Sequence, residues 1–446
     1  MKAPICDFVE RYADSGNLRL HMPGHKGVPF LGVEDKDITE VEGADVLYMS
    51  SGIILESEKN ASMLFGTKKT LYSTEGSSLC IRAMVYLAVI YAKSKGRRPL
   101  ILVARNAHKT FLGASALSGA EVEWLYPETD GNVISCPIDP DRLRLRIESM
   151  TQRPAALYVT SPDYLGNMAD IGKIADVCHS LDVLLMVDNA HGAYLGFLPE
   201  SRHPIKLGAD ICCDSAHKTL PVLTGGAYLH ISHRAPDMFV DMAEQAMSMF
   251  ASTSPSYLIL QSLDRANLYL SEDYRERLAR LVSGVEILKD RLTDKGFELL
   301  GEEGTKPTVS SKEYGYFGFE VAEYLRQNGI ECEFSDPDFV VMMFTAEISD
   351  GDIARLEKAL ISLPKKEKIV AATPKLTAPE RIMSVREAML SQSELIPIEK
   401  AAGRVLASPS VSCPPAVPII ACGELIDEEV VKCFEYYSID SCRVVK

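Results

Sequence analysis

The stretch Asp214-Ser-Ala-His-Lys-Thr-Leu220, followed by Thr224-Gly225-Gly226, decides how this chain is interpreted. Lysine side chains are mostly exposed, so Lys218 taken alone would most simply be a surface residue. Here small hydroxyl side chains and His217 flank Lys218, and a Gly-Gly turn follows. A lysine amine that forms a Schiff base beside phosphate-binding hydroxyl groups needs these residue types. The stretch therefore predicts a chemically active lysine.

A carboxylate stands upstream at the end of an apolar run. Residues 183–187 (VLLMV) read as a buried strand, and Asp188-Asn189-Ala190-His191 follows directly. A carboxylate at the C-terminal end of a parallel strand points into the ligand crevice of an open α/β sheet. There Asp188 can pair with a protonated pyridine nitrogen. The alternative is a strand-end aspartate that caps the next element.

Two further segments place polar groups at a helix start and after a strand, where they could also contact a cofactor. Gly76, Ser77 and Ser78 open a predicted helix over 77–93, where backbone N–H groups and the helix dipole favour a phosphate. Taken alone, this start is an ordinary N-cap. His108 follows an apolar strand over 99–104 and could stack on a pyridine face, whereas its simpler interpretation is a loop histidine. In chain order these groups form a phosphate cradle, a stacking ring, a pyridine acid and a lysine, which together predict a pyridoxal-phosphate (PLP) site.

Strand and helix patterns alternate through the same region. Apolar strands are predicted over 99–104, 155–160, 183–187 and 225–231, with helices over 77–93 and 171–180. Such alternation predicts an α/β fold with a mostly parallel sheet and right-handed crossovers. The predicted parts are an irregular N-terminal arm (1–60), a PLP-binding large domain (61–255), a long bridging helix (256–292) with a smaller α/β domain (256–370 together), and a C-terminal domain (371–446) with short helices around a Pro-rich loop at 414–418.

Composition narrows the class of protein. The chain has 446 residues, 46% hydrophobic and 24% charged, and no apolar run long enough to span a membrane. Eleven cysteines are scattered without a CxxC pair, which predicts neither a zinc or other metal site nor a secreted disulfide framework. The net charge of −15 disfavours nucleic acid and anionic membranes as partners. With no apolar signal segment at the N-terminus, we expect a cytoplasmic enzyme.

Motifs along most of the chain resemble those of the bacterial ornithine/lysine/arginine decarboxylases, which are fold-type I PLP enzymes. The similarity is strongest in the lysine stretch and in the arm. The matching segments are His21–Gly27 (HMPGHKG), Arg105–Lys109 (RNAHK), Thr160–Gly166 (TSPDYLG), Asp214–Leu220, Ser252–Tyr257 (STSPSY), and Pro414–Pro418 followed by Gly423-Glu424. The chain resembles the short members of this family, which have no N-terminal wing domain.

The resemblance implies roles for these residues. Lys218 would be the Schiff-base lysine, Asp188 would bind the pyridine nitrogen, and His108 would stack on the ring. The remaining predicted cofactor residues are Gly76, Ser77, Ser78, His191, Ser215, His217 and Ser254. Family members are homodimers or larger with active sites at the subunit interface, so the arm and Ser254 are expected to serve the partner's site.

The chain also departs from the family pattern. Asn189 stands where a glutamate is usual and Glu75 where an asparagine is usual. In the tail, Ala416 replaces a glycine and Cys422 a proline. The change at Asn189 removes a carboxylate near the ring, and the tail changes affect a segment that could line the substrate entrance.

We expect the reaction to be decarboxylation of lysine, arginine or ornithine. An aminotransferase clamps the substrate carboxylate with arginine, but residues 296–363 contain only Arg326 and Arg355, both on predicted exposed helix faces. Lys218 or His217 would return the proton to Cα. A buried substrate cation needs a carboxylate partner. The candidates are Glu333, Asp336 and Glu424.

Other interpretations stay open at this point. Glu333 and Asp336 could be solvated turn acids. The fold could also support another PLP reaction, such as transamination or lyase chemistry. A third possibility is a catalytically silent homologue that acts as an oligomeric or regulatory partner.

Overall fold

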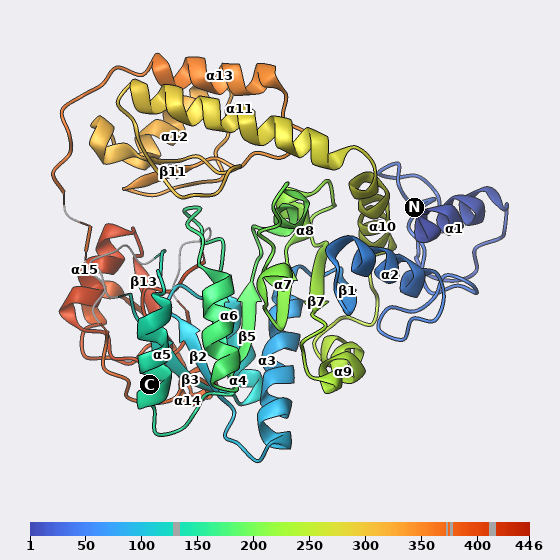
Figure 1. Cartoon of the computed structure of the whole chain (residues 1–446), viewed down its shortest axis with the longest axis horizontal. Coiled ribbons are helices and arrows are strands. Elements are labelled where there is room, and N and C mark those ends of the chain that lie inside the picture. The colour runs from blue at the N-terminus through green and yellow to red at the C-terminus, as the bar shows by residue number, and fades with distance from the viewer. Residues whose placement is uncertain (128–133, 372, 375–377, 410–415) are drawn as a thin grey trace. The chain divides into compact units, whose positions relative to one another are not determined.

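The computed structural model describes residues 1–127, 134–371, 373–374, 378–409 and 416–446. The chain forms two compact units, each built from two stretches of sequence (Figure 1). The first unit comprises residues 1–95 and 171–276, and the second comprises residues 96–170 and 277–446. The division into arm, large domain, small domain and C-terminal domain stays a prediction.

The first unit contains four strands in the order β1-β7-β6-β5. β5 and β6 are parallel, whereas β7 is antiparallel to both β1 and β6. Its elements are α1 Pro4–Asp14, α2 Ile53–Phe65, β1 Lys69–Ser73, α3 Ser77–Ser94, α6 Ile171–Ser180, β5 Leu184–Asp188, the 3-10 helix η1 Ala193–Phe197, α7 Pro204–Leu207, β6 Ile211–Asp214, α8 Ala216–Thr219, β7 Ala227–Ile231, α9 Asp237–Ser248 and α10 Tyr257–Ser271.

The middle of this sheet lies in the core. Every residue of β5, β6 and β7 is buried, as expected for strands covered on both faces. The helix α3 packs across the strands of this unit and against α9, and most of its side chains are buried because it is apolar on nearly all sides. The predicted helices over 77–93 and 171–180, and the predicted strands at β5 and β7, are confirmed.

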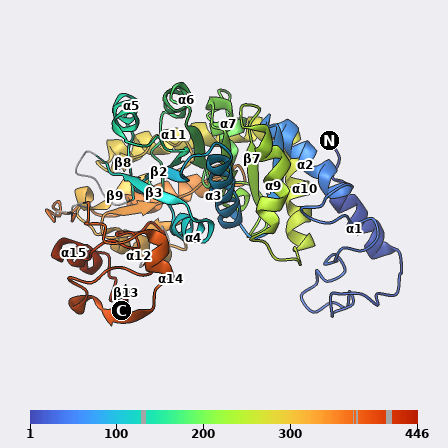
Figure 2. The ribbon, with the colours of Figure 1, turned by 90° about the horizontal axis from the view of Figure 1, so that it is seen from below.

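The N-terminal part is more ordered than the predicted irregular arm. The prediction is wrong for α1 and α2, which pack together with α10 (Figure 2). α1 begins with a proline in its first turn and buries Ile5 and Val9 one turn apart. Residues 15–52 do form an irregular arm. It exposes large apolar side chains, among them Leu18, Leu20, Met22, Phe30 and Leu31.

The second unit contains a parallel set of strands, β4-β2-β3, a four-stranded antiparallel sheet, β10-β11-β9-β8, and an antiparallel pair, β12-β13. Its elements are β2 Leu100–Ala104, α4 Lys109–Ser118, β3 Glu121–Leu125, α5 Pro140–Ser149, β4 Ala156–Thr160, α11 Tyr274–Asp294 (which starts in the first unit), β8 Glu298–Leu300, β9 Thr308–Ser310, η2 Ser311–Tyr314, α12 Gly318–Gln327, β10 Phe334–Ser335, β11 Phe339–Val341, α13 Asp350–Ile361, α14 Val385–Leu390, β12 Ser393–Pro397, η3 Ile398–Lys400, α15 Glu428–Tyr436 and β13 Ser441–Val445.

The observed elements differ from two of the expectations drawn from the sequence. The single long helix predicted over 256–292 is two helices, because α10 ends where Glu272 leaves the helical conformation. The tail has the short helices α14 and α15 as predicted, but it also contains the unpredicted pair β12-β13. Pro414 and Pro415 of the predicted Pro-rich loop lie outside the described residues. Among the described residues, no helix combines the length and apolar character needed to cross a membrane.

Candidate active site

Lys218 lies in α8, a single helical turn that follows the buried strand β6. The backbone carbonyl of Ser215 accepts a hydrogen bond from the Lys218 N–H at 2.9 Å. The Lys218 Nζ donates to Nε2 of His191, also at 2.9 Å, and His191 is itself buried. Strand order therefore brings together two of the predicted cofactor residues.

The side chain of His217 is held by the glycine turn that follows. The N–H of His217 and its ring Nδ1 both lie 3.2 Å from the carbonyl oxygen of Gly226. Because a carbonyl only accepts hydrogen bonds, the ring proton of the neutral imidazole resides on Nδ1. Ser215 Oγ lies 3.4 Å from the same nitrogen. The Gly-Gly turn thus fixes the ring orientation of His217.

Asp188 is the last residue of β5, and only 2% of its surface is exposed. Its Oδ1 accepts from the N–H of Ala190 at 3.2 Å and from the thiol of Cys213 at 3.6 Å. Burial raises the pKa of Cys213 well above its usual value, and the neighbouring Asp188 adds to this effect. Cys213 therefore stays a thiol and a donor. A buried carboxylate held at a strand end is suited to bind a protonated ring nitrogen.

The predicted phosphate cradle lies between β1 and α3. Gly76 and Gly225 both have positive φ angles, +72° and +100°, and the N–H of Gly76 donates to the Gly225 carbonyl at 2.7 Å. A Cβ on Gly225 would approach the Thr74 carbonyl oxygen to 2.9 Å. α3 begins at Ser77, and the residue before it, Gly76, has no side chain with which to cap the helix. These residues fit a phosphate group, because the N–H groups of a helix start and adjoining hydroxyl side chains bind anions.

Ser254 lies in the exposed loop between α9 and α10. Its N–H donates to Ser252 Oγ at 3.1 Å, and the Ser252 N–H donates to Glu75 Oε1 at 2.7 Å. Glu75, one of the departures from the family pattern, therefore holds this loop against the cradle.

His108 belongs to the second unit, where it caps the N-terminus of α4. Its Nδ1 accepts from the N–H of Thr110 at 3.2 Å. Arg105 of the same motif is fully buried and donates to the carbonyls of Pro418 and Ile419 at 2.8 and 2.9 Å. The conspicuous RNAHK motif thus also anchors the tail, a role that the sequence did not reveal.

Glu424 is the partner of this arginine. Its Oε2 lies 3.7 Å from the Arg105 guanidinium and accepts from the N–H of Ala421 at 2.7 Å, while Oε1 accepts from the Tyr126 hydroxyl at 3.0 Å. Only 1% of Glu424 is exposed. The carboxylate already has a buried cation and two donors as partners. Of the tail departures, Cys422 is buried and Ala416 adopts a positive φ of 59°.

Glu333 has a different environment. It is exposed, and its Oε1 accepts a 2.6 Å hydrogen bond from the hydroxyl of Tyr164. The loop that carries Tyr164 is fastened to residues 302–308. The Gly166 carbonyl accepts from Glu302 and Glu303, and Thr308 donates to the Leu165 carbonyl. The family-like loop therefore presents an aromatic hydroxyl to an acid that remains open to solvent.

Asp336, three residues further, points inward. Its Oδ1 accepts two backbone N–H groups, from Asp338 and Phe339, both at 2.7 Å. Burial raises the pKa of Asp336 to about 7, and the nearby Asp338 contributes. The two acids predicted as substrate anchors in this segment are thus distinct, because Glu333 is exposed, whereas Asp336 is buried and has a raised pKa.

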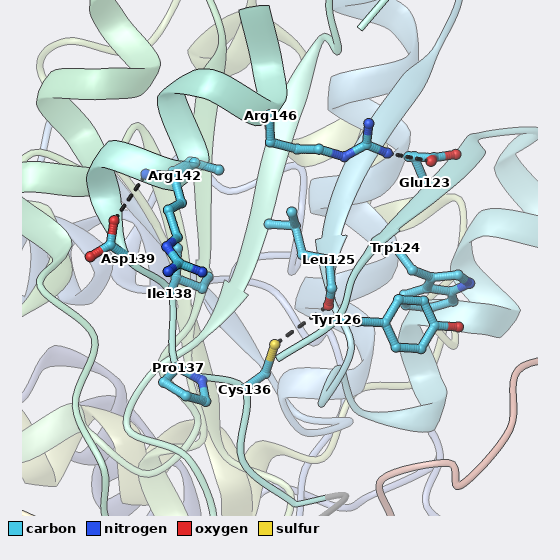
Figure 3. Close-up of a pocket in the computed structure, with 11 residues that line it drawn as sticks. Glu123, Trp124, Leu125, Tyr126, Cys136, Pro137, Ile138, Asp139, Arg142 and Arg146 are labelled. Carbon is cyan, nitrogen blue, oxygen red and sulfur yellow. Dashed lines mark hydrogen bonds and ion pairs between the residues drawn. The ribbon is translucent and has the colours of Figure 1, made fainter. Parts of the chain in front are cut away.

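A cavity of about 660 Å³ lies at the end of β3 and the start of α5 (Figure 3). Arg142 extends into it, Arg146 pairs with Glu123 at 2.6 Å, and the Cys136 thiol donates to the Leu125 carbonyl. The predicted site residues are absent from its described lining. Its lining does include Tyr126, whose hydroxyl donates to Glu424.

Comparison with known proteins gives the family. Residues 3–301 match the family described as Orn/Lys/Arg decarboxylase, major domain, and residues 366–441 match its C-terminal domain. The chain belongs to the Orn/Lys/Arg decarboxylase family. It is 31% identical to the arginine decarboxylase of Bacillus subtilis over 96% of this chain and 92% of that protein. It is 29% identical to the arginine decarboxylase of Bacillus anthracis over 96% of this chain and 91% of that protein.

Solved structures agree on the fold. The constitutive lysine decarboxylase of E. coli superposes with a TM-score of 0.78 at 19% identity, covering 100% of this chain and 82% of that one. The lysine decarboxylase of Francisella novicida gives 0.79 at 17% identity, covering 100% and 81%. A serine palmitoyltransferase from Sphingomonas wittichii gives 0.57 over 81% of this chain and 83% of that chain at 13% identity. The predicted fold-type I α/β architecture and family resemblance are confirmed, and the chain is an amino-acid decarboxylase.

Proposed function

We propose that Lys218 carries pyridoxal phosphate and that the chain decarboxylates lysine, arginine or ornithine to the corresponding amine and CO2. The observation that carries this proposal is the grouping of Lys218, His191, Asp188 and the glycine cradle in the first unit of a chain from a decarboxylase family. When bound, pyridoxal phosphate supplies an electron sink for the electron pair left at Cα as CO2 departs.

The residues of the first unit each have a task in this proposal. The N-terminus of α3, with Gly76, Ser77 and Ser78, binds the phosphate together with Ser215. Asp188 keeps a proton on the ring nitrogen, because a buried carboxylate gains most from an opposite charge beside it. Lys218, or His217 as the second candidate, returns the proton to Cα. We further propose that His108 stacks on the ring.

For the substrate anchor we favour Glu333. A substrate ammonium or guanidinium needs a charged acid, and Glu333 is exposed with the Tyr164 hydroxyl to orient it. Asp336 and Glu424 stay candidates, but burial favours a protonated Asp336, and Glu424 already pairs with Arg105. Arg326 and Arg355 do not act as a carboxylate clamp: Arg326 pairs with Glu323 and Glu331, and Arg355 donates to the Asn328 carbonyl, all on the surface.

We also propose a cytoplasmic homodimer. The arm exposes Leu18, Leu20, Phe30 and Leu31 by 78 to 89% each, and large exposed apolar side chains gathered in one segment favour an interaction surface. A second copy of the chain, with Ser254 of each copy serving the other's site, would bury it. The described cysteines are free thiols, which suits a reducing compartment.

The test is borohydride reduction of the PLP-loaded protein followed by peptide mapping, together with CO2 release from lysine, arginine and ornithine. The expected result is a label on Lys218 and turnover of at least one of the three. A label on another lysine overturns the assignment of Lys218. A correct label without CO2 release, combined with turnover in an amino-transfer or side-chain cleavage assay, favours a different PLP reaction.

A further inference from the structure

A buried group of polar side chains lies directly beneath the lysine segment. Asp214, the last residue of β6, has no exposed surface, and its Oδ2 lies 3.0 Å from Nε2 of His203 and 3.2 Å from Nε2 of His230. The two histidines are buried as well. The three ligand-type atoms lie close enough together to hold a metal ion, so the protonation of the rings decides what the group is.

The partners of the ring nitrogens decide where the protons of His203 and His230 lie. The N–H of Ile205 donates to Nδ1 of His203 at 3.4 Å, and Nδ1 of His230 is 2.9 Å from the Thr70 hydroxyl. Asp214 is an ionised carboxylate, and a carboxylate oxygen only accepts hydrogen bonds. The Nε2 atom of each ring therefore carries a proton and donates to Asp214, at ordinary hydrogen-bond lengths. A zinc ion would need bare nitrogens about 2.0–2.1 Å away, so the geometry is that of a hydrogen-bonded network.

This network leaves Asp214 an acceptor on both oxygens. Burial opposes its ionisation, but His203 and His230 outweigh this and hold the pKa of Asp214 below its usual value. Its second oxygen, Oδ1, accepts a 2.7 Å hydrogen bond from the side-chain amide of Asn189. Asn189 is fully buried, follows Asp188, and donates its own N–H to the Cys213 carbonyl at 3.0 Å. One side-chain contact thus links the residue after the predicted pyridine acid to the residue that opens the Schiff-base segment.

We propose that Asp214 dictates the residue at position 189 and that the Asp214–Asn189 pair positions Asp188 and Lys218 for cofactor binding. The proposal rests on the function proposed above. Two histidine N–H groups already bind Oδ2 of Asp214. Its other oxygen, Oδ1, faces the end of β5 and can only accept a hydrogen bond, so the residue at position 189 must supply a donor. An acid at position 189, the type usual in the family, would face it with a second acceptor. The departure at Asn189 is therefore the matching half of this network, and it does not signal lost activity.

The test is a suppression experiment. Asn189→Asp places two carboxylates face to face in the core, and we expect it to weaken binding of PLP to the apo-protein by ~30–100-fold, as for a buried acceptor left without a donor. We expect Asp214→Asn alone to weaken PLP binding less, by no more than ~10-fold, because the Asn189 side-chain amide can rotate by half a turn and pair with the new amide. In the double variant the amide introduced at position 214 donates to the carboxylate introduced at position 189, while the amide oxygen accepts from both histidines. We expect affinity within ~3-fold of that of Asp214→Asn alone.

Asp210 provides the matched control. It is another buried aspartate of the same unit, next to the other end of β6, with His179 Nε2 at 3.1 Å and the Leu185 N–H at 2.7 Å. Asp210→Asn should not rescue Asn189→Asp. Two readouts accompany PLP affinity: the thermal unfolding of each apo-protein, and the pH midpoint of the long-wavelength absorbance of the bound cofactor. The midpoint should shift in Asn189→Asp, return in the double variant and stay shifted in the Asp210 control.

The outcomes separate the two proposals. A wild-type protein that binds no PLP overturns both. If the wild-type protein binds PLP, but the double variant loses as much binding free energy for PLP as the two single variants together, only the pairing of Asp214 with position 189 is overturned. Rescue of thermal unfolding without rescue of PLP affinity and absorbance midpoint shows a structural pair and overturns the positioning role.

Discussion

Replacing Asp336 with asparagine should make the stability of the protein less sensitive to a rise in pH from about 5 to about 8.5. The Asp336 side chain is 8% exposed, and its Oδ1 accepts two backbone N–H groups. Its Oδ2 is buried without a hydrogen-bond partner among the described residues. Burial of an ionised carboxylate in such a place is poorly offset, so the neutral form is favoured. An asparagine keeps the shape and removes the charge.

The magnitude follows from the pKa of Asp336, which burial raises from 3.8 to about 7. A difference of roughly three pH units corresponds to about 4 kcal/mol, at about 1.4 kcal/mol per unit. The folded state holds the proton more tightly, so the stabilising effect is fully present below about pH 4 and is lost as the pH rises through about 7. Between these limits the wild-type free energy of unfolding should fall by about 1.4 kcal/mol per pH unit from this group alone.

The assay is urea unfolding of the wild type and Asp336→Asn at about pH 5 and about pH 8.5, with amide hydrogen exchange of β10 and β11 as a local probe. The variant should gain roughly 3 kcal/mol relative to the wild type between the two pH values. Glu333→Gln, at an exposed acid on the same segment, is the control and should run parallel to the wild type. A constant difference between Asp336→Asn and wild type across this pH range would refute the reasoning.

Three further results are expected. Glu333→Gln should raise KM for basic substrates by ~10–100-fold, equivalent to roughly 1.4–2.8 kcal/mol, while Asp336→Asn leaves KM near the wild-type value; unchanged KM in Glu333→Gln would place the anchor elsewhere. Asp188→Asn should fold and bind PLP but lose most turnover in steady-state kinetics, because a neutral amide cannot hold the pyridine proton as a carboxylate does; near wild-type kcat would remove that role. Leu20→Glu with Leu31→Glu in the arm should shift sedimentation at micromolar concentration toward the monomer, and an unaltered dimer would mean that the interface lies outside the arm.

The sequence was sufficient where the signal was local. The strand that ends at Asp188 and the helix that begins at Ser77 were predictable, because a short apolar run and a glycine-serine helix start each lie within a few residues. α1 also had a local signal, since Pro4, Ile5 and Val9 have the spacing of an amphipathic helix start. The polar and glycine-rich residues that follow concealed it.

The parts that could not be predicted depend on partners far away in sequence. Strands β12 and β13 lie far apart in the tail, at Ser393–Pro397 and Ser441–Val445, and the alternation in each strand is too short to identify on its own. Asn189 illustrates the same limit in the site. From sequence it was a missing carboxylate, whereas in the structure it donates to a carboxylate on the next strand.

The three acids considered as substrate anchors show why sequence position alone could not rank them. Each is a carboxylate in a loop or strand end, and composition treats them alike. Their surroundings differ through long-range contacts. Arg105 from a different part of the second unit pairs with Glu424, burial favours the neutral form of Asp336, and Tyr164 donates a hydrogen bond to the exposed Glu333. An acid can attract a substrate cation only if it keeps its charge and lacks an internal cation. Glu424 already has an internal cation, and burial favours the neutral form of Asp336, so we propose Glu333 as the anchor. The choice follows from the partners of each acid and not from the acid itself.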